Sequence, residues 1–287
     1  MISFRFHLVS LAAVFLALAL GIVLGATVVD QATVNVLECR IKSVRGDAAN
    51  ARDELHLWER FGDQAETAVI AGRLEGVRVL TVMPEGVSGD LVSRVHATLA
   101  TAGAIDAGML TLDSAWADDT PRSRSDIASV LGIVGPVNIS AATAEAAARI
   151  ATDFANGGGT TLPLLATANL VHLDSGDPAT APGAQARIMV IDDGAPTGLV
   201  EPLVRALGAK MQARVLVADA SADDQIEQSL VGVLRHDPGD TKLTTIDHLG
   251  TTQGRIAAVL ALRDFDAGTV GDYGSGPGAD RAVPASG

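Results

Sequence analysis

Residues 8–29 read LVSLAAVFLALALGIVLGATVV, an unbroken apolar stretch of 22 residues without a charged side chain. At about 1.5 Å per residue, a helix of this length spans the roughly 30 Å hydrocarbon core of a bilayer. The stretch therefore predicts a transmembrane anchor over residues 8–29, preceded by a short N-terminus of residues 1–7.

A cleaved secretory signal peptide is the alternative, because Ala17 and Ala19 resemble the small residues of a cleavage site. The apolar region of a signal peptide is only about 7–15 residues long. Here the apolar residues continue for ten positions beyond Ala19. We therefore favour an uncleaved anchor.

The charges beside the anchor indicate its orientation. Arg5, the free N-terminus and His7 precede it, and Asp30 is the first charged residue after it. Positive charge is enriched on the cytoplasmic side of membrane proteins. We expect a single-pass protein of the cell membrane whose bulk is extracytoplasmic, in a periplasm-like space or the outer envelope.

A heptad pattern follows the anchor and predicts a coiled-coil stalk over residues 30–75. Apolar or small residues recur at alternating steps of three and four over about five heptads, and no proline occurs before Pro84. The pattern continues through Gly62, Ala65, Val69 and Gly72. The residues expected to form the coiled-coil interface are Val34, Leu37, Ile41, Val44, Ala48, Ala51, Leu55 and Trp58.

The flanking charges only partly favour a parallel homodimer of this stalk. In the heptad, Asp47 would attract Arg52 across the seam, whereas Glu54 would repel Glu59. Either the dimer is weak and the membrane raises its local concentration, or the stalk pairs with another protein. A single amphipathic helix that packs on its own globular domain is the remaining alternative. Cys39 lies at an outward position, so we expect a free thiol there.

Beyond Gly76 the pattern becomes that of an α/β domain, predicted over residues 76–265. A β-branched run at 77–83 predicts a strand, 90–102 a helix and 104–112 a second strand. The same order returns with a strand at 187–192, a helix at 199–207 and a strand at 213–218. This predicts a Rossmann-like layered domain with parallel strands, in two related halves of about 76–165 and 185–265.

Further elements are predicted around these two units. We expect a polar loop at 121–125 and an alanine-rich helix at 141–156. The second half continues with a helix at 223–234, a strand at 243–246 and a helix at 252–262. Residues 266–287 are rich in Gly, Asp, Ala, Ser and Pro, a composition that predicts a disordered tail.

Composition excludes several classes of function. The formal net charge of −13 makes the chain a poor nucleic-acid binder, and we expect no nucleic-acid partner. Cys39 is the only cysteine, which excludes an intrachain disulfide and a cysteine zinc cluster.

Catalytic motifs are incomplete. The sequence around Ser88, GVSGD at 86–90, lacks the closing glycine of a nucleophile elbow, and no Gly-Lys-Ser/Thr of a P-loop is present. Pro196 follows Asp192-Asp193-Gly194 where a dinucleotide-binding turn would need a backbone amide. We expect no enzyme activity and no cofactor.

Metal ligands are also sparse. No two of the six histidines stand four residues apart. His236-Asp237 and Asp247-His248 could converge around the strand at 243–246, but solvated loop histidines are the commoner case. We therefore predict no metal ligands.

Both ends of the chain resemble one actinobacterial family. The carrying segments are MIS at 1–3 and HLVSLAAVFLALA at 7–19, then LTTID at 243–247, GRI at 254–256, LAL at 260–262 and GDYG at 271–274. They resemble the MctB family of mycobacterial copper transport proteins and its corynebacterial SteB-like branch, whose pattern there is S-T-V-D, G-R-I, L-A-L and G-H-Y-G. The middle of the chain resembles the family in layout only.

The resemblance implies a role in copper transport or homeostasis at the cell envelope. Its SteB-like branch implies instead a dimeric coiled-coil scaffold that works with a SteA-like membrane protein to regulate cell-wall hydrolysis in division. Asp272 stands where the family pattern has histidine, and a carboxylate is a harder ligand that suits copper less well. The residues themselves predict a non-catalytic, membrane-anchored homodimer.

Overall fold

The computed structural model describes residues 4–135, 138–174, 186–194, 198–211, 214–221 and 225–285. The chain divides into two compact units, Met1–Phe61 and Gly62–Gly287. Pro196, the start of the helix expected at 223–234 and the first residue of the strand expected at 213–218 lie outside the described residues.

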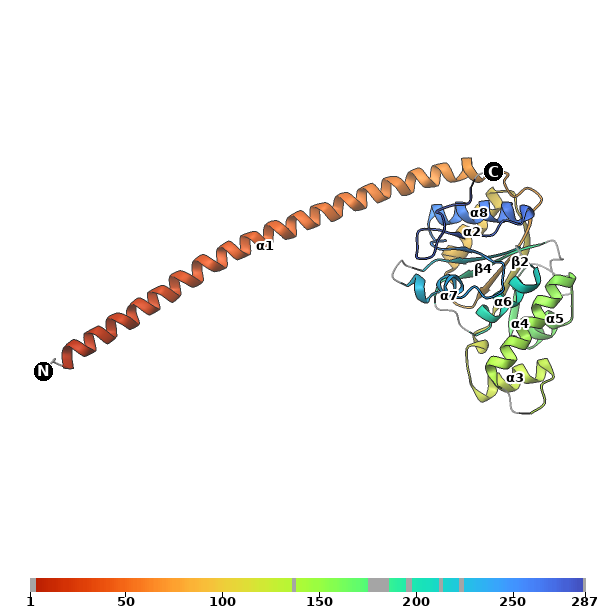
Figure 1. Cartoon of the computed structure of the whole chain (residues 1–287), viewed down its shortest axis with the longest axis horizontal. Coiled ribbons are helices and arrows are strands. Elements are labelled where there is room, and N and C mark those ends of the chain that lie inside the picture. The colour runs from red at the N-terminus through yellow and green to blue at the C-terminus, as the bar shows by residue number, and fades with distance from the viewer. Residues whose placement is uncertain are drawn as a thin grey trace. The chain divides into compact units, whose positions relative to one another are not determined.

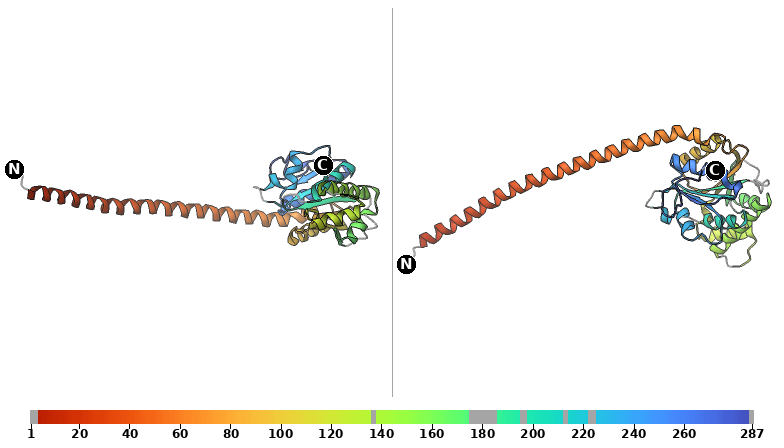
Figure 2. Two further views of the ribbon diagram at one scale, coloured as in Figure 1. Left: turned by 90° about the horizontal axis from the view of Figure 1, so that it is seen from below. Right: turned by 45° about the horizontal axis from the view of Figure 1, so that its top comes forward.

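Helix α1 runs without a break from Phe4 to Ile70 (Figures 1 and 2). Within it, Phe6–Leu24 is long and apolar enough to cross a membrane. The helix includes the predicted anchor and most of the predicted stalk, and it ends at Ile70, short of the expected boundary at residue 75. The absence of proline and the alternation of apolar with charged positions favour this continuous helix.

The predicted interface residues lie along α1. The structure contains one chain, so the coiled coil and the homodimer stay predictions. The side chain of Val34 lies outside those that the structure describes. The remaining side chains of the predicted interface are all exposed: Leu37, Ile41, Val44, Ala48, Ala51, Leu55 and Trp58.

The second unit is a mixed α/β domain built on one seven-stranded sheet with the order β3-β2-β1-β4-β5-β6-β7. All neighbouring strands are parallel except β3, which runs antiparallel to β2. The strands are β1 (Arg78–Pro84), β2 (Ile105–Leu112), β3 (Val171–Asp174), β4 (Arg187–Asp192), β5 (Val215–Asp219), β6 (Thr244–Ile246) and β7 (Asp272–Tyr273).

Helices cover both faces of this sheet (Figure 1). The first face is covered by the end of α1, α2 (Gly89–Thr101) and α8 (Thr252–Asp264). The second is covered by α3 (Pro121–Leu131), α4 (Ile139–Asn156), α5 (Thr161–Thr167), α6 (Val200–Met211) and α7 (Leu230–His236). Three short 3₁₀ helices complete the unit: η1 (Ser114–Trp116), η2 (Ile226–Gln228) and η3 (Phe265–Ala267).

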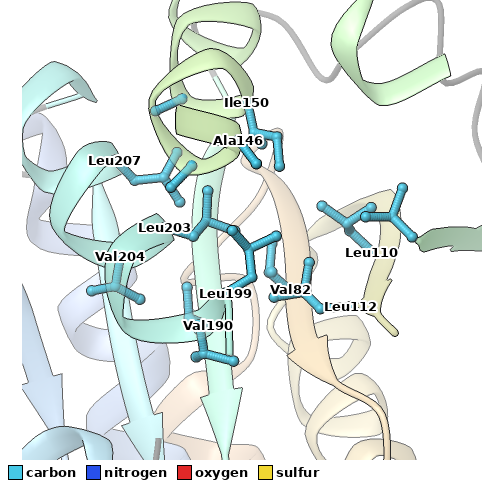
Figure 3. Close-up of a cluster of buried hydrophobic side chains, with 14 of the residues drawn as sticks. Val82, Leu110, Leu112, Ala146, Ile150, Val190, Leu199, Leu203, Val204 and Leu207 are labelled. Atoms are coloured by element: carbon cyan, nitrogen blue, oxygen red, sulfur yellow. The ribbon is translucent and has the colours of Figure 1, made fainter. Parts of the chain in front are cut away.

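Two hydrophobic cores result, one on each face. Because successive side chains of a strand point to opposite faces, Val190 of β4 belongs to the core under α4 and α6, and Met189 to the core under α2 and α8. Figure 3 shows side chains of α4 and α6 directed at Val82 and Val190. Both faces are buried, which explains why the strands read as continuous apolar runs.

The predicted halves meet in the middle of one sheet, where β1 pairs with β4 and Val79 lies opposite Arg187. The expected strand at 187–192 coincides with β4, and those at 77–83 and 104–112 match β1 and β2 within one residue. Helix α3 occupies the stretch that the sequence predicts as a polar loop. The relationship between the halves and the Rossmann-like assignment stay predictions.

The prediction of a disordered tail is wrong for residues 266–285. Asp272–Tyr273 forms strand β7, which pairs with β6, and Tyr273 is buried. Asp266 forms an ion pair of 2.6 Å with the buried Arg187. Composition misled the prediction because this segment is held chiefly by hydrogen bonds and charge, which need little apolar surface.

Candidate functional site

The last turns of α1 are fastened to the α/β domain by a buried ion pair. Arg255 of α8 donates to both carboxylate oxygens of Glu66, from Nε to Oε1 (3.1 Å) and from Nη2 to Oε2 (2.9 Å). Only 8% of the Arg255 side chain and 13% of the Glu66 side chain are exposed. A two-point contact of this kind fixes direction as well as distance. We call this contact and its neighbours the stalk joint.

Four further residues complete the stalk joint. Thr98 of α2 donates to Oε1 of Glu66 (2.7 Å), and Thr252 at the start of α8 donates to Asp63 (2.6 Å). Gly62 lies so close to Thr252 that a side chain there would be in contact with its methyl group. The joint therefore holds two consecutive turns of α1 against both helices of that face.

The stalk joint shares Gly62 with the predicted coiled-coil seam and then follows a different stripe of α1. Gly62, Glu66 and Ile70 are four residues apart, so they share one side of the helix, and Ile70 is fully buried. The predicted seam continues instead through Ala65 and Val69, and Val69 is partly exposed. At about 100° per residue, the two stripes diverge beyond Gly62. The alternative of a helix packed on its own domain thus holds for these last turns.

A second polar network surrounds Asp247, which follows β6 and is fully buried. Its carboxylate accepts hydrogen bonds from Arg235 Nη1 (2.7 Å), from the backbone amides of Ser275 (2.9 Å) and Gly276 (3.0 Å), and pairs with His248 Nδ1 (2.5 Å). Burial acts to raise the pKa of Asp247, but the hydrogen bonds from His248 and Arg235 outweigh it, so this pKa is lowered.

This network holds the segment 271–281, which we call the C-terminal strap. Arg235 also donates to the carbonyl of Tyr273 (2.8 Å) and to Thr245 Oγ1 (2.8 Å). Gly274 has a φ of +133°, and a side chain there would collide with the Asp247 carboxylate. The glycine of the GDYG segment is therefore needed for the strap to approach Asp247.

Asp272 of the GDYG segment belongs to the same network. Its Oδ1 accepts a hydrogen bond from Thr245 Oγ1 (2.5 Å) and lies 3.9 Å from Nε of Arg235. The carboxylate therefore neutralises part of the charge of Arg235 and helps to attach the strap to β6.

In the part of the chain that the structure describes, no three His, Cys, Asp or Glu side chains gather where they could hold a metal ion. His248 contacts Asp247 and Ser275. Among the described residues, it does not form a group of three metal-binding side chains with His236. The described residues thus offer no site built from three of these four residue types. The side chain of Cys39 lies outside the described side chains.

The incomplete serine motif around Ser88 lies at the turn between β1 and α2. Ser88 precedes α2, and its backbone amide donates to the carboxylate of Asp193 (3.2 Å). This contact ties the end of β1 to the end of β4.

Sequence reasoning missed both polar networks, although it quoted the segments that carry them. Arg255 and Asp247 stand in the GRI and LTTID segments, but their partners Glu66 and Ser275 are distant in sequence or lie in the expected tail. The one available signal was the occurrence of a charged residue inside an apolar helix or directly after an apolar strand.

The chain resembles known proteins along nearly its whole length. The family described as "Copper transport outer membrane protein, MctB" matches residues 1–284. The copper transporters MctB of Mycobacterium tuberculosis (strain H37Rv) and Mycobacterium bovis are each 25% identical to the chain, over 97% of this chain and 98% of theirs. Copper transporter MctB of Mycobacterium leprae is 24% identical over the same shares.

Proposed function

Because the chain belongs to the MctB family of copper transport outer membrane proteins, we propose that it serves copper transport in the cell envelope as a non-catalytic, membrane-anchored component. The observation that carries the proposal is the family match over residues 1–284, which includes the anchor, the stalk and the folded C-terminus. Copper is the cargo of this process.

In this proposal the chain contributes assembly rather than copper coordination. Copper(I) is selected by sulfur ligands, and the described residues gather no group of three or more His, Cys, Asp or Glu side chains that could hold a metal ion. The segment Phe6–Leu24 would anchor the protein as a single pass with its bulk outside the cytoplasm. The exposed apolar side chains of α1 would then pair two copies in parallel.

A scaffold of SteB type is the second candidate, and the stalk joint favours it. Because Glu66 is held by Arg255 and Thr98, a rotation of the last turns of α1 would be transmitted to α2 and α8. Such a coupling suits a protein that relays the state of a SteA-like membrane partner in the control of cell-wall hydrolysis.

Deletion of the gene in its host tests the two candidates together. A copper role predicts an altered cellular copper content as external copper rises, restored by the wild-type gene. A scaffold of SteB type predicts defects in cell separation at unchanged copper content. Unchanged copper content in the deletion strain would contradict the copper role.

Copper titration of the purified full-length chain separates a direct from an indirect role. We expect no saturable binding of copper(I) to the described domain. Saturable binding that persists after Cys39→Ser would contradict the assembly role, because it would require a ligand set elsewhere in the chain.

A further inference from the structure

The carboxyl ends of β4 and β5 place two buried aspartates side by side. Asp192 is the last residue of β4, Asp219 is the last residue of β5, and the two are direct partners in the parallel register. Neighbouring strands lie about 4.8 Å apart, and paired residues point to the same face of a sheet. The exposed fractions are 4% for Asp192 and 0% for Asp219. Two carboxylates therefore share one water-poor position.

In each carboxylate, only one of the two oxygens accepts a hydrogen bond from the described residues. One oxygen of Asp192 accepts the backbone amide of Asp193 (2.9 Å), and one oxygen of Asp219 accepts the backbone amide of Ser221 (2.6 Å). Oδ2 of both residues is buried without a hydrogen-bond partner among the described residues. A buried carboxylate oxygen without a donor costs considerable free energy. A positively charged group in contact with these two oxygens would remove this cost.

A third buried oxygen for which the structure describes no partner belongs to Ser221, two residues after Asp219. Ser221 is 5% exposed, and its Oγ also has no partner in the described parts of the chain. Its backbone amide is bound to Asp219, so the hydroxyl lies within two residues of that carboxylate along the chain. Unlike the aspartates, the serine contributes no charge. Its unused hydroxyl independently indicates a missing oxygen-binding partner.

No basic side chain in the described segments neutralises the pair. The charges that act on Asp192 are those of Asp219 and Asp193, and both are negative. Together with burial, which is the larger cause, they raise the pKa of Asp192 to about 7. Asp193 itself is exposed and accepts the amide of Ser88, so it adds charge without being part of the buried group.

We propose that Asp192, Asp219 and Ser221 form a binding site for a hard divalent cation of the Mg²⁺ and Ca²⁺ class. Carboxylate and hydroxyl oxygens are the ligands that these ions prefer, and Mg²⁺ is commonly held by one or two carboxylates together with water. The cation would join the ends of β4 and β5 and neutralise both aspartates. The site is separate from the stalk joint and does not depend on the copper role.

Isothermal titration of the full-length chain in detergent micelles tests this site. The protein is stripped with EDTA and titrated at about pH 8 with MgCl₂ and, separately, with CaCl₂, above the raised pKa of Asp192. We expect one cation per chain with a dissociation constant of roughly 0.1–1 mM, as for other extracellular calcium sites of modest charge. The arm with the higher affinity identifies the preferred ion.

Isosteric variants assign the ligands. Asp192→Asn and Asp219→Asn should each weaken binding at least about tenfold. Asp193→Asn is the matched control, because it removes the same charge next to the site but no ligand, and should change the affinity less than about threefold. Ser221→Ala should weaken binding without a folding defect, since its hydroxyl makes no hydrogen bond with the described residues.

Two results would overturn the site. The first is the absence of saturable binding of either ion up to about 10 mM, well above the range of extracellular calcium sites. The second is an equal loss of affinity in Asp193→Asn and Asp219→Asn. That result would indicate that the aspartates at the ends of β4 and β5 attract cations without forming a defined site.

Discussion

Replacement of Arg255 by methionine should release the end of the stalk helix from the domain. Methionine keeps most of the length and apolar surface of the arginine stem but removes the guanidinium. Glu66 would then be left with one hydrogen bond, from Thr98, in a position where only 13% of its side chain is exposed. The expected loss of stability comes from this buried, unpaired carboxylate rather than from lost packing.

The expected loss of stability follows from the burial of the Arg255–Glu66 ion pair. Breaking a buried ion pair by removing one partner costs about 3–5 kcal/mol. Because Glu66 retains some contact with solvent and keeps the Thr98 hydrogen bond, we expect about 3 kcal/mol. At 1.4 kcal/mol per factor of ten, the backbone amides at the end of α1 should exchange roughly 100-fold faster.

Hydrogen exchange followed by mass spectrometry measures this change in peptides that cover residues 62–74. The fluorescence of the buried Trp116 reports whether the α/β domain stays folded. Arg149→Met is the control, since the pair of Arg149 with Glu145 is nearly half exposed and should contribute less than about 1 kcal/mol.

A double variant tests whether the unpaired charge of Glu66 causes the faster exchange. Adding Glu66→Met to Arg255→Met removes the stranded charge and should restore much of the protection, because apolar replacement of a whole buried pair is often neutral. Exchange in residues 62–74 that stays within about threefold of the wild type in Arg255→Met would refute the role of the joint. So would a double variant that is no better protected than Arg255→Met alone.

Three further predictions address other parts of the chain. Leu37→Asp together with Ile41→Asp should abolish self-association of the full-length chain, because the seam would bury charge; an unchanged mass in analytical ultracentrifugation would contradict the coiled-coil dimer. Gly274→Ala should destabilise the domain by at least about 2 kcal/mol in urea unfolding, since the positive φ and the collision with Asp247 both oppose a side chain. Asp247→Asn should lower the thermal unfolding midpoint at pH 7. The folded-state pKa of Asp247 lies below 3.8, so the stabilisation by its carboxylate is present above that value and is lost as the pH falls through the folded-state pKa. The difference between variant and wild type should accordingly shrink in acid, and a constant difference from pH 7 to about pH 3 would show that ionisation of Asp247 is not its source.

Local patterns were enough to predict much of the fold. The run RIMVID coincides with β4 because a strand buried on both faces needs apolar side chains at every position, which is visible in six residues. Helix α6 was recognised from its 3.6-residue period, and α1 from its length without proline. Each of these signals depends only on residues within a few turns of one another.

The predicted tail shows where local patterns end. Its composition is that of disordered segments, yet Tyr273 is buried and Gly274 lies against Asp247. Stabilising partners stand 26 to 79 residues earlier along the chain, for example Asp247 for Tyr273, Arg235 for Pro277 and Arg187 for Asp266. A short polar segment is read correctly only when its hydrogen-bond partners are known.

The amino-acid sequence alone was enough to predict an apolar N-terminal helix, its continuation as one long helix and an α/β domain, because periodicity and hydropathy act over short distances along the chain. Only the tertiary structure decided that Arg255 meets Glu66 across 189 residues and that Asp192 lies beside Asp219. It also decided that the last residues form an edge strand. Burial and pairing of charges depend on which elements become neighbours, and that adjacency is set by the packing of the whole sheet.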